Sequence, residues 1–492
     1  MGTSVFNIQI VFSLTWKYIV FISITLYVIP AYCNDNSYYG SNFLTNRNSE
    51  ISHGPGERCF CKLEGRIDDC TCSVDTVDFF NNNKIYPRLK SLLVRNYFRY
   101  FKVNLNRACP FWPDDSKCAI KDCSVKACSE EQIPPGIKRP SFGERNKNTA
   151  NKSLNKYSKE AQEEDNCDEN HGGLGAVDKT ISEKSKEDFK QWQKHDDSQD
   201  IFCEIEDELS QGMQYVDLLI NPEKYTGYKG PSARRIWRSI YEENCFKPGK
   251  GYGPYTTSKN LNAMCLEKRA FYRAISGLHT SINIHLCAQY LMPIRNSFGS
   301  GEWSINLKEF QRRFDPQQTF GEGPQWLKNL YFVYLLELRA LAKAAPYLER
   351  ELFYTGLDEE DKEVQMAVKD FLSIVKSFPD HFQESVMFVG KDEGAKKLKE
   401  EFRQHFRNIS RIMDCVGCDK CRLWGKLQTQ GLGTAMKILF SGDQDSDLHM
   451  SDVKKEKFQL TRIEIVSLFN AFGRLSNSVY QLENFRKMMK EL

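Results

Sequence analysis

The sequence carries almost no net charge and few long apolar runs, and these absences exclude several classes of protein. Its 68 Lys and Arg residues nearly balance 65 Asp and Glu residues, which leaves a formal net charge of +3. That balance gives no electrostatic reason to expect nucleic acid as a partner. We find no internal repeat and no glycine-rich phosphate loop. Beyond the N-terminus, no run reaches the roughly 18 apolar residues of a membrane span.

The N-terminus predicts entry into the secretory pathway. Residues 18–29 are apolar or hydroxylic and uncharged, Lys17 precedes them, and Pro30 begins a short polar exit that ends at Cys33. This pattern predicts a signal peptide over 1–33, with an uncleaved anchor as the alternative, and a flexible N-terminus over 34–58. Disulfides persist in that pathway. Asn151 and Asn408 begin glycosylation sequons, which is consistent with it.

The 17 cysteines carry most of the chemical information, and three of them form one compact motif. Cys415, Cys418 and Cys421 are separated by two residues each. This spacing suits a metal or iron–sulfur site, a redox dithiol with a third structural cysteine, or a purely structural set of disulfides. The signal peptide counts against iron–sulfur, and we expect no metal site. A helix expected over 423–440 would place Cys418 or Cys421 near its start, where backbone amides, Lys420 and Arg422 stabilise a thiolate.

The other cysteines indicate disulfides and a mobile tether. Two closely spaced pairs mirror each other, and the antiparallel register predicts nested bridges Cys59–Cys72 and Cys61–Cys70, with a four-thiolate zinc site as the alternative. Cys245 and Cys265 flank a Gly/Pro loop that a bridge between them could staple. The polar stretch 143–188 is predicted to be weakly ordered, so its Cys167 could reach more than one partner.

Apolar spacing predicts a mostly α fold, with a helical bundle and a loop-rich N-terminal third. A central buried helix is expected over 327–341, and Thr461 and Glu464 form a capping box at the start of a further helix. The remaining segments with helical spacing are 79–100, 233–241, 268–291, 395–413 and 425–440.

Five runs together resemble the endoplasmic reticulum oxidoreductin family, and the resemblance extends from about Cys59 to Leu492. These runs are 59–72, 109–112, 225–231, 241–246 and 414–426. The resemblance implies an FAD-dependent thiol oxidase of protein disulfide isomerase in the endoplasmic reticulum lumen. It implies one mostly α domain over 59–492, with FAD in a helical bundle and a mobile shuttle and regulatory loop over 118–190.

The resemblance also assigns roles to the cysteines. Cys418 and Cys421 would be the active-site pair facing the flavin, and Cys118 and Cys123 the outer shuttle pair. Electrons would pass from reduced isomerase through both pairs to FAD and then to molecular oxygen, releasing hydrogen peroxide. Three further bridges are implied: Cys109–Cys415 as a structural link, and Cys118–Cys167 and Cys123–Cys128 as regulatory pairs.

For FAD, the resemblance implies contacts from a set of side chains with diverse chemistry: Thr226, Trp237, Ser276, His279 and Arg313. Each of these also has an ordinary structural interpretation. Lys224 stands where the family usually has Arg, and Trp326 where another Arg is expected, so FAD affinity is in question.

The remaining expectations concern location, leftover cysteines and an alternative function. The last four residues, 489–492, do not match the tetrapeptide retention signal, so retention would depend on a partner protein. Peripheral association with the luminal side of the membrane is compatible with the resemblance. Cys203 and Cys287 are expected to be buried thiols, and Cys33 to leave with the signal peptide. The alternative function is a disulfide-rich binding protein that kept the scaffold and lost tight FAD binding.

Overall fold

The structure is a computed structural model, and it describes the helical body of the chain. The described residues are 74–112, 123–138, 202–203, 212–224, 230–246, 261, 264–293, 301–378, 384–388, 393–440 and 460–490. The predicted signal peptide, the residues 34–58, the 59–72 hairpin, Asn151 and most of the 118–190 loop lie outside them. Within the described residues the fold is mostly α, as predicted.

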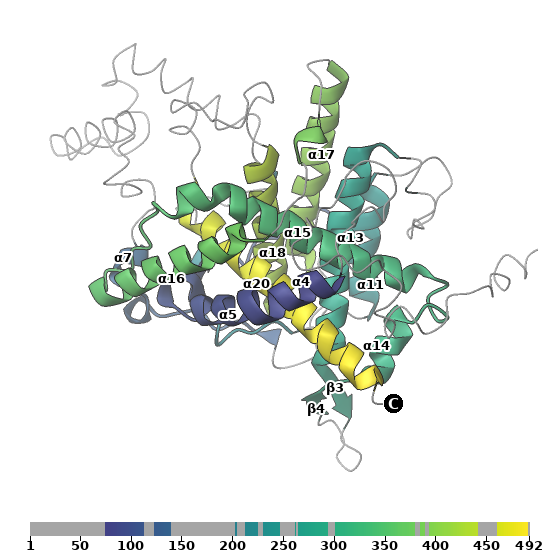
Figure 1. Cartoon of the computed structure of the whole chain (residues 1–492), viewed down its shortest axis with the longest axis horizontal. Coiled ribbons are helices and arrows are strands. Elements are labelled where there is room, and N and C mark those ends of the chain that lie inside the picture. Colours follow the sequence, from purple (N-terminus) through teal and green to yellow (C-terminus); the bar gives the residue numbers. More distant parts are fainter. Residues whose placement is uncertain are drawn as a thin grey trace, which may run out of the picture.

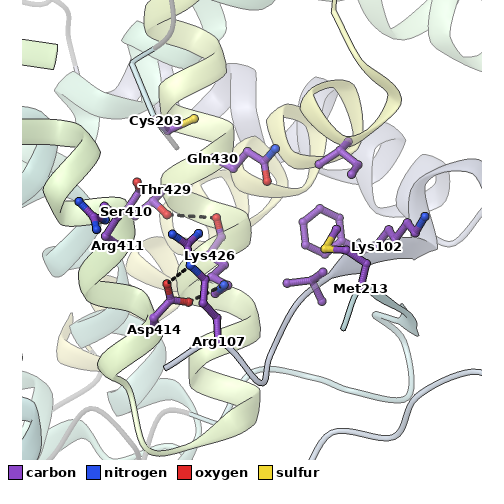
Figure 2. Close-up of a pocket in the computed structure, with 13 residues that line it drawn as sticks. Lys102, Arg107, Cys203, Met213, Ser410, Arg411, Asp414, Lys426, Thr429 and Gln430 are labelled. Atoms are coloured by element: carbon purple, nitrogen blue, oxygen red, sulfur yellow. Dashed lines mark hydrogen bonds and ion pairs between the residues drawn. The ribbon is translucent and has the colours of Figure 1, made fainter. Parts of the chain in front are cut away.

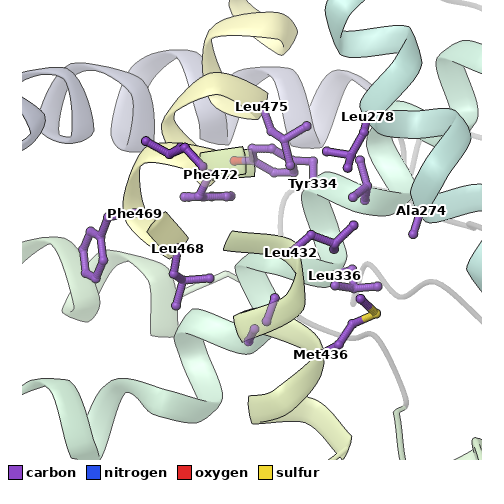
Figure 3. Packing of buried hydrophobic residues seen from close by; sticks show 14 of the residues in the cluster. Ala274, Leu278, Tyr334, Leu336, Leu432, Met436, Leu468, Phe469, Phe472 and Leu475 are labelled. Atoms are coloured by element: carbon purple, nitrogen blue, oxygen red, sulfur yellow. The ribbon is translucent and has the colours of Figure 1, made fainter. Parts of the chain in front are cut away.

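Four long helices cross at the centre of the molecule and form its core (Figure 1). They are α13 (Leu266–Ala288), α15 (Glu322–Leu348), α18 (Asp419–Phe440) and α20 (Arg462–Lys490). Each is buried around most of its circumference, which is typical of a helix inside a large core. Figure 3 shows Tyr334 of α15 among Leu278, Leu432 and Phe472, which come from the other three helices. The predicted central buried helix is confirmed as α15.

Glycines allow these helices to pack unusually closely. A Cβ on Gly277 of α13 would come within 3.0 Å of the backbone carbonyl of Asn329 in α15. A Cβ on Gly431 of α18 would come equally close to Ser467 and Ala471 of α20. The backbones touch where these side chains are missing, so α18 is fixed against its neighbours.

Shorter elements surround the four-helix core. On one side lie α4 (Val74–Phe80), η1 (Asn81–Ile85), α5 (Tyr86–Leu93), α6 (Asn96–Arg99) and α16 (Asp358–Lys376). The others are α7 (Pro135–Lys138), α11 (Gly230–Arg238), η5 (Ser239–Glu243), α14 (Leu307–Phe314), α17 (Glu393–Ile412) and the one-turn helices η3 (Glu130–Gln132), η6 (Glu384–Val386) and η7 (Met413–Cys415). Two antiparallel ribbons complete the described part: β1 (Tyr100–Val103) with β2 (Gln214–Asp217), and β3 (Tyr290–Pro293) with β4 (Gly301–Ser304).

Two helix starts matter for the site. The capping box is confirmed: the Thr461 hydroxyl accepts from the Glu464 amide at 3.1 Å, and the Glu464 carboxylate accepts from the Thr461 amide at 2.6 Å. The helix α18 begins at Asp419, earlier than predicted, which places both Cys418 and Cys421 at its first turn. No described helix combines the length and the apolar character needed to cross a bilayer.

Candidate active site

The two cysteines at the start of α18 lie in contact with each other. Cys418 is the N-cap residue, since its carbonyl accepts the first helical hydrogen bond, from Arg422, at 2.7 Å. Its sulfur accepts from the backbone amide of Cys421 at 3.4 Å, and the two Sγ atoms are 2.7 Å apart. Both side chains are buried, with 3% and 0% exposure. A disulfide of about 2.05 Å therefore needs only a small movement of either side chain.

The environment lowers the pKa of one cysteine of the pair. The hydrogen bond from the Cys421 side chain lowers the pKa of Cys418, burial acts in the opposite direction, and the amides of Cys421 and Lys420 lower it further. The Cys421 thiol also lies 2.6 Å from the Lys224 carbonyl oxygen. Cys421 carries a single hydrogen, so at any moment it bonds either the Cys418 sulfur or the Lys224 carbonyl oxygen. Cys418 is the cysteine whose ionisation the surroundings favour. The Arg422 guanidinium donates to the Val416 and Leu105 carbonyls at 2.8 and 2.6 Å, so the predicted assistance from Arg422 would act through its charge.

The third cysteine of the motif is in a disulfide. Cys415 is bonded to Cys109, with 4.5 Å between the Cα atoms, so the structure contains the bridge that the family resemblance implied. A sulfur that is part of a disulfide cannot serve as a thiolate ligand, so Cys415 is not available to the metal site considered as an alternative. The described residues also contain no cluster of three or more His, Cys, Asp or Glu side chains that could hold a metal ion.

A buried ion pair holds the incoming chain to this motif. Asp414, only 2% exposed, pairs with Lys426 at 2.5 Å and with Arg107 at 3.4 Å. Figure 2 shows these three groups converging beside α18. The Lys426 ammonium also donates to the Asn104 carbonyl at 2.9 Å. The segment that leads to Cys109 is therefore fixed to the first turns of α18.

A second segment, Asn221–Lys224, lies against another face of α18. The indole of Trp424 donates to the Asn221 carbonyl at 2.8 Å, and the amide of Gln428 lies 3.4 Å from the Glu223 carboxylate. Together with the Cys421–Lys224 contact, these bonds come from residues at i, i+3 and i+7 on α18, which is one helix face. The backbone next to the cysteine pair is therefore clamped along its length.

A cavity of about 580 Å³, including its mouth, lies next to the pair between α11, α13, α17 and α18. Gly425, one turn beyond Cys421, forms part of its wall, as does Val416. The other walls are mainly aliphatic, with Trp237, Gln428 and Thr429 as larger or polar groups. Neither Cys418 nor Cys421 is among the residues that line this cavity, and the lining suits a largely apolar molecule.

The aromatic side of this cavity continues into a stack. The rings of Trp237 and His279 lie 3.7 Å apart at 11°, and the Tyr241 hydroxyl is 3.1 Å from the His279 Nδ1. Burial lowers the pKa of His279 to about 3, with the nearby charge of Arg313 acting in the same direction, so the imidazole is neutral. Ring edges and a neutral imidazole fit a planar heteroaromatic ligand.

Comparison with known proteins identifies the family. The model of the family described as Endoplasmic Reticulum Oxidoreductin 1 matches residues 84–482. The chain belongs to this oxidoreductin family. It is 54% identical to an Ero1-like protein of Drosophila melanogaster, with 88% of this chain and 92% of the relative covered, and 53% identical to human ERO1-like protein alpha, with 89% and 93% covered.

Solved oxidoreductin structures have the same helical fold. A mutant of S. cerevisiae Ero1p aligns with a TM-score of 0.54 and 30% identity, covering 85% of this chain and 98% of that one. A second Ero1p structure, described as a source of disulfide bonds for oxidative protein folding in the cell, aligns with a TM-score of 0.53, 30% identity and coverage of 85% and 99%. The family resemblance predicted from the sequence is confirmed.

The other side chains assigned to FAD in this oxidoreductin are not among the residues that line the cavity. Their contacts in the described part of the chain are as follows. Arg313 donates to Asn283 at 2.5 Å and to Glu309 at 2.7 Å, which leaves part of its donor set available. Ser276 accepts from the Asn329 amide at 3.0 Å and does not line the cavity. The Lys224 ammonium lies 4.7 Å from the centre of the Trp303 ring. Trp326 is half-buried in α15, and Thr226 lies outside the described residues.

Two predicted cysteine pairings differ from the structure. Cys123 is buried and disulfide-bonded, whereas Cys128 is a free thiol, so the regulatory Cys123–Cys128 bridge is not present. The reason is that the Cys123 sulfur already forms another disulfide and can form only one such bond. Cys118 and Cys167, the other members of the outer set, lie outside the described residues.

The predicted staple between Cys245 and Cys265 is wrong, since both are free thiols. Cys245 lies in the hydrophobic core, and burial raises its pKa, while Cys265 is exposed at the N-cap of α13. Their sulfurs thus face different environments. Cys203 and Cys287 are buried free thiols, as predicted. Asn408 lies on α17, partly exposed.

Sequence reasoning missed the charged groups that surround the pair. Asp414, Lys426 and Arg107 also border a second cavity, of about 460 Å³, on which Cys203 and Thr429 lie as well (Figure 2). Charged residues within apolar helical runs were the only signal available for such groups. That signal does not name their partners, some of which, such as Arg107 for Asp414, are hundreds of residues away in the chain.

Proposed function

We propose that this chain is a luminal thiol oxidase that reoxidises protein disulfide isomerase and thereby supports oxidative protein folding. Electrons pass from the isomerase through an outer pair, Cys118 and Cys123, to the inner pair, Cys418 and Cys421. The supporting observation is the inner pair itself, two buried cysteines in contact at the start of α18, one with a lowered pKa, on a helix whose next turn lines an aromatic-edged cavity. Residence in the endoplasmic reticulum lumen is maintained by a partner protein.

The protein steps are thiol–disulfide exchanges. A thiolate of the reduced outer pair attacks one sulfur of the oxidised inner pair, a new S–S bond forms, and the inner bond breaks to release the other sulfur. The second outer sulfur then attacks the mixed disulfide. The outer pair leaves as a disulfide and the inner pair as a dithiol, so two electrons have moved inward. The contact between Cys421 and the Lys224 carbonyl holds the thiol proton that this reduction creates.

FAD is the cofactor that we propose for this site, and the apolar and aromatic lining of the cavity supports it. Its ring system would lie between the aliphatic wall and Gly425, with Trp237 and His279 as aromatic contacts. Arg313 and Lys224 supply positive charge for the pyrophosphate, and Ser276 and Thr226 supply hydroxyls. When bound, FAD accepts two electrons and passes them to molecular oxygen, giving hydrogen peroxide.

The alternative is a binding protein that has lost tight FAD affinity. Two features of Lys224 favour this alternative. Its ammonium lies over the Trp303 ring, and Lys lacks the two-point fork with which Arg holds a phosphate. Flavin content separates the two functions directly.

The test uses the purified full-length chain. We expect a yellow protein with flavin absorbance that consumes oxygen when given reduced protein disulfide isomerase. Cys421→Ala should abolish oxygen uptake, whereas Cys287→Ala, which removes an equally buried free thiol of α13, should retain it. A colourless wild-type protein that leaves oxygen untouched would overturn the proposal and support the binding-protein alternative.

A further inference from the structure

The Asn221–Lys224 segment is anchored firmly at its first residue. The Asn221 side chain bonds the backbone of Lys126 twice, at 2.8 Å each, and donates to the Asp217 carbonyl at 3.0 Å. Its carbonyl accepts from Trp424. These bonds fix the start of the segment but not Lys224, three residues later, whose carbonyl contacts the Cys421 thiol.

Close to that carbonyl, the side chain of Glu223 forms a buried ion pair with Arg474 of α20. The guanidinium donates through Nε at 2.6 Å and through Nη2 at 3.0 Å to the two carboxylate oxygens. The side chains are 3% and 4% exposed. This two-point geometry is the most directional pairing available to a carboxylate, and burial protects it from water.

The far side of Arg474 is satisfied as well. Its Nη1 donates to the Ser281 hydroxyl at 2.8 Å, and that hydroxyl lies 2.5 Å from Ser478, which in turn lies 2.9 Å from His285. Burial lowers the pKa of His285 to about 3, so this imidazole is neutral and adds no second positive charge. The arrangement therefore contains one positive and one negative charge, and it joins Glu223 of the Asn221–Lys224 segment to α13 and α20, two helices of the core.

We infer that the Glu223–Arg474 ion pair is a positioning pair for the inner cysteines: it holds the Lys224 carbonyl oxygen where it accepts the Cys421 thiol hydrogen. This inference rests on the proposed function and assigns it two further residues. Neither touches a sulfur, so both act through the backbone of Lys224.

The consequence concerns the inner disulfide equilibrium. The Cys421 thiol can donate its one hydrogen to Lys224 in the dithiol, where Cys418 carries a hydrogen of its own, whereas a disulfide has no hydrogen to give. The hydrogen bond therefore stabilises the dithiol and makes the pair a stronger electron acceptor. A net hydrogen bond in a protein is typically worth enough to change an equilibrium about tenfold. A variant in which the Lys224 carbonyl moves away should therefore have an inner disulfide that is about tenfold harder to reduce. For a two-electron couple, this corresponds to a reduction potential about 30 mV more negative.

The experiment measures this equilibrium without using oxidase activity. Full-length wild type, Glu223→Gln and Arg474→Lys are equilibrated in glutathione buffers, quenched in acid, alkylated under denaturing conditions and analysed by mass spectrometry at Cys418 and Cys421. Asp78→Asn is the matched control, because Asp78 also forms a buried pair with an arginine of α20, Arg486, far along that helix from Arg474. Circular dichroism verifies that each variant is folded.

We expect Glu223→Gln to shift the equilibrium constant about tenfold toward the disulfide and Arg474→Lys to shift it in the same direction, while Asp78→Asn matches wild type. Folded Glu223 and Arg474 variants with the wild-type constant, or an equal shift in Asp78→Asn, would overturn the inference and leave the proposed function standing. A wild-type pair that never forms a reversible disulfide would remove the proposed function itself, and the inference with it.

Discussion

Glu337 in the middle of α15 offers a sharp test of how this core handles charge. The side chain is 0% exposed, and neither carboxylate oxygen has a hydrogen-bond partner among the described residues. Burial alone raises the pKa of this carboxyl well above its ordinary value of 4.5. Above pH 4.5 the folded protein therefore keeps this proton over a pH range in which the unfolded chain has already lost it.

This difference makes stability depend on pH in a definite direction. A carboxyl with a raised pKa binds its proton more tightly when folded, so its contribution is fully present below pH 4.5 and is lost as the pH rises through the folded pKa. Between those limits one extra proton is bound in the folded state. The free energy of unfolding should then fall by about 1.4 kcal/mol per pH unit because of this residue alone.

The change Glu337→Gln removes the titration and keeps the shape. We expect urea denaturation between pH 5 and 7, with the disulfides intact, to give a shallower pH dependence for the variant than for wild type. Glu349→Gln, at the end of the same helix and 31% exposed, is the control and should keep the wild-type slope. Parallel curves for wild type and Glu337→Gln would refute the reasoning, since they would show that the buried carboxyl exchanges no extra proton on folding.

Three further predictions concern the packing and the links around the site. Gly277→Ala places a Cβ against the Asn329 backbone and should cost about 1–3 kcal/mol, measured by thermal unfolding. Lys426→Met leaves the Asp414 carboxylate buried without its closest cation and should cost about 3–5 kcal/mol in urea, most of which Asp414→Asn in the same chain restores. Cys415→Ala opens a bridge that spans 306 residues and should cost about 2–5 kcal/mol under oxidising conditions.

Specific results would contradict each of these. An unchanged melting temperature for Gly277→Ala would mean that α13 and α15 can separate freely. A double variant of Asp414 and Lys426 no more stable than Lys426→Met would show that the stranded charge is not the source of the loss. Equal stability of Cys415→Ala and wild type would assign no constraint to the bridge.

Much of the helical framework could be predicted from the sequence, because apolar spacing survives in long buried helices. The central helix around 327–341 and the capping box at Thr461 were identified correctly on this basis. The start of α18 was placed too late, since Cys418 is not a usual capping residue and the charged first turn hides the periodicity.

Pairings across the chain were harder to predict. The Cys109–Cys415 bridge came only from the family resemblance, because nothing local to either cysteine specifies a partner 306 residues away. The predicted Cys245–Cys265 disulfide was wrong although the two cysteines are close in the sequence. Their spacing indicates a loop, but spacing contains no information on the direction in which each sulfur points. Glu223 and Arg474 are likewise joined by the fold alone.

The first turns of α18 are held by Asn104 and Leu105 on one face and by Asn221 on another, and Gly431 presses the same helix onto α20. In the proposed function, a helix held by these contacts keeps Cys418 and Cys421 in place while they form and break their disulfide. The movement needed to bring electrons to them is then made by the outer cysteine pair. In the proposed relay the inner pair is thus a fixed receiver, and its chemistry is set by the helix that carries it.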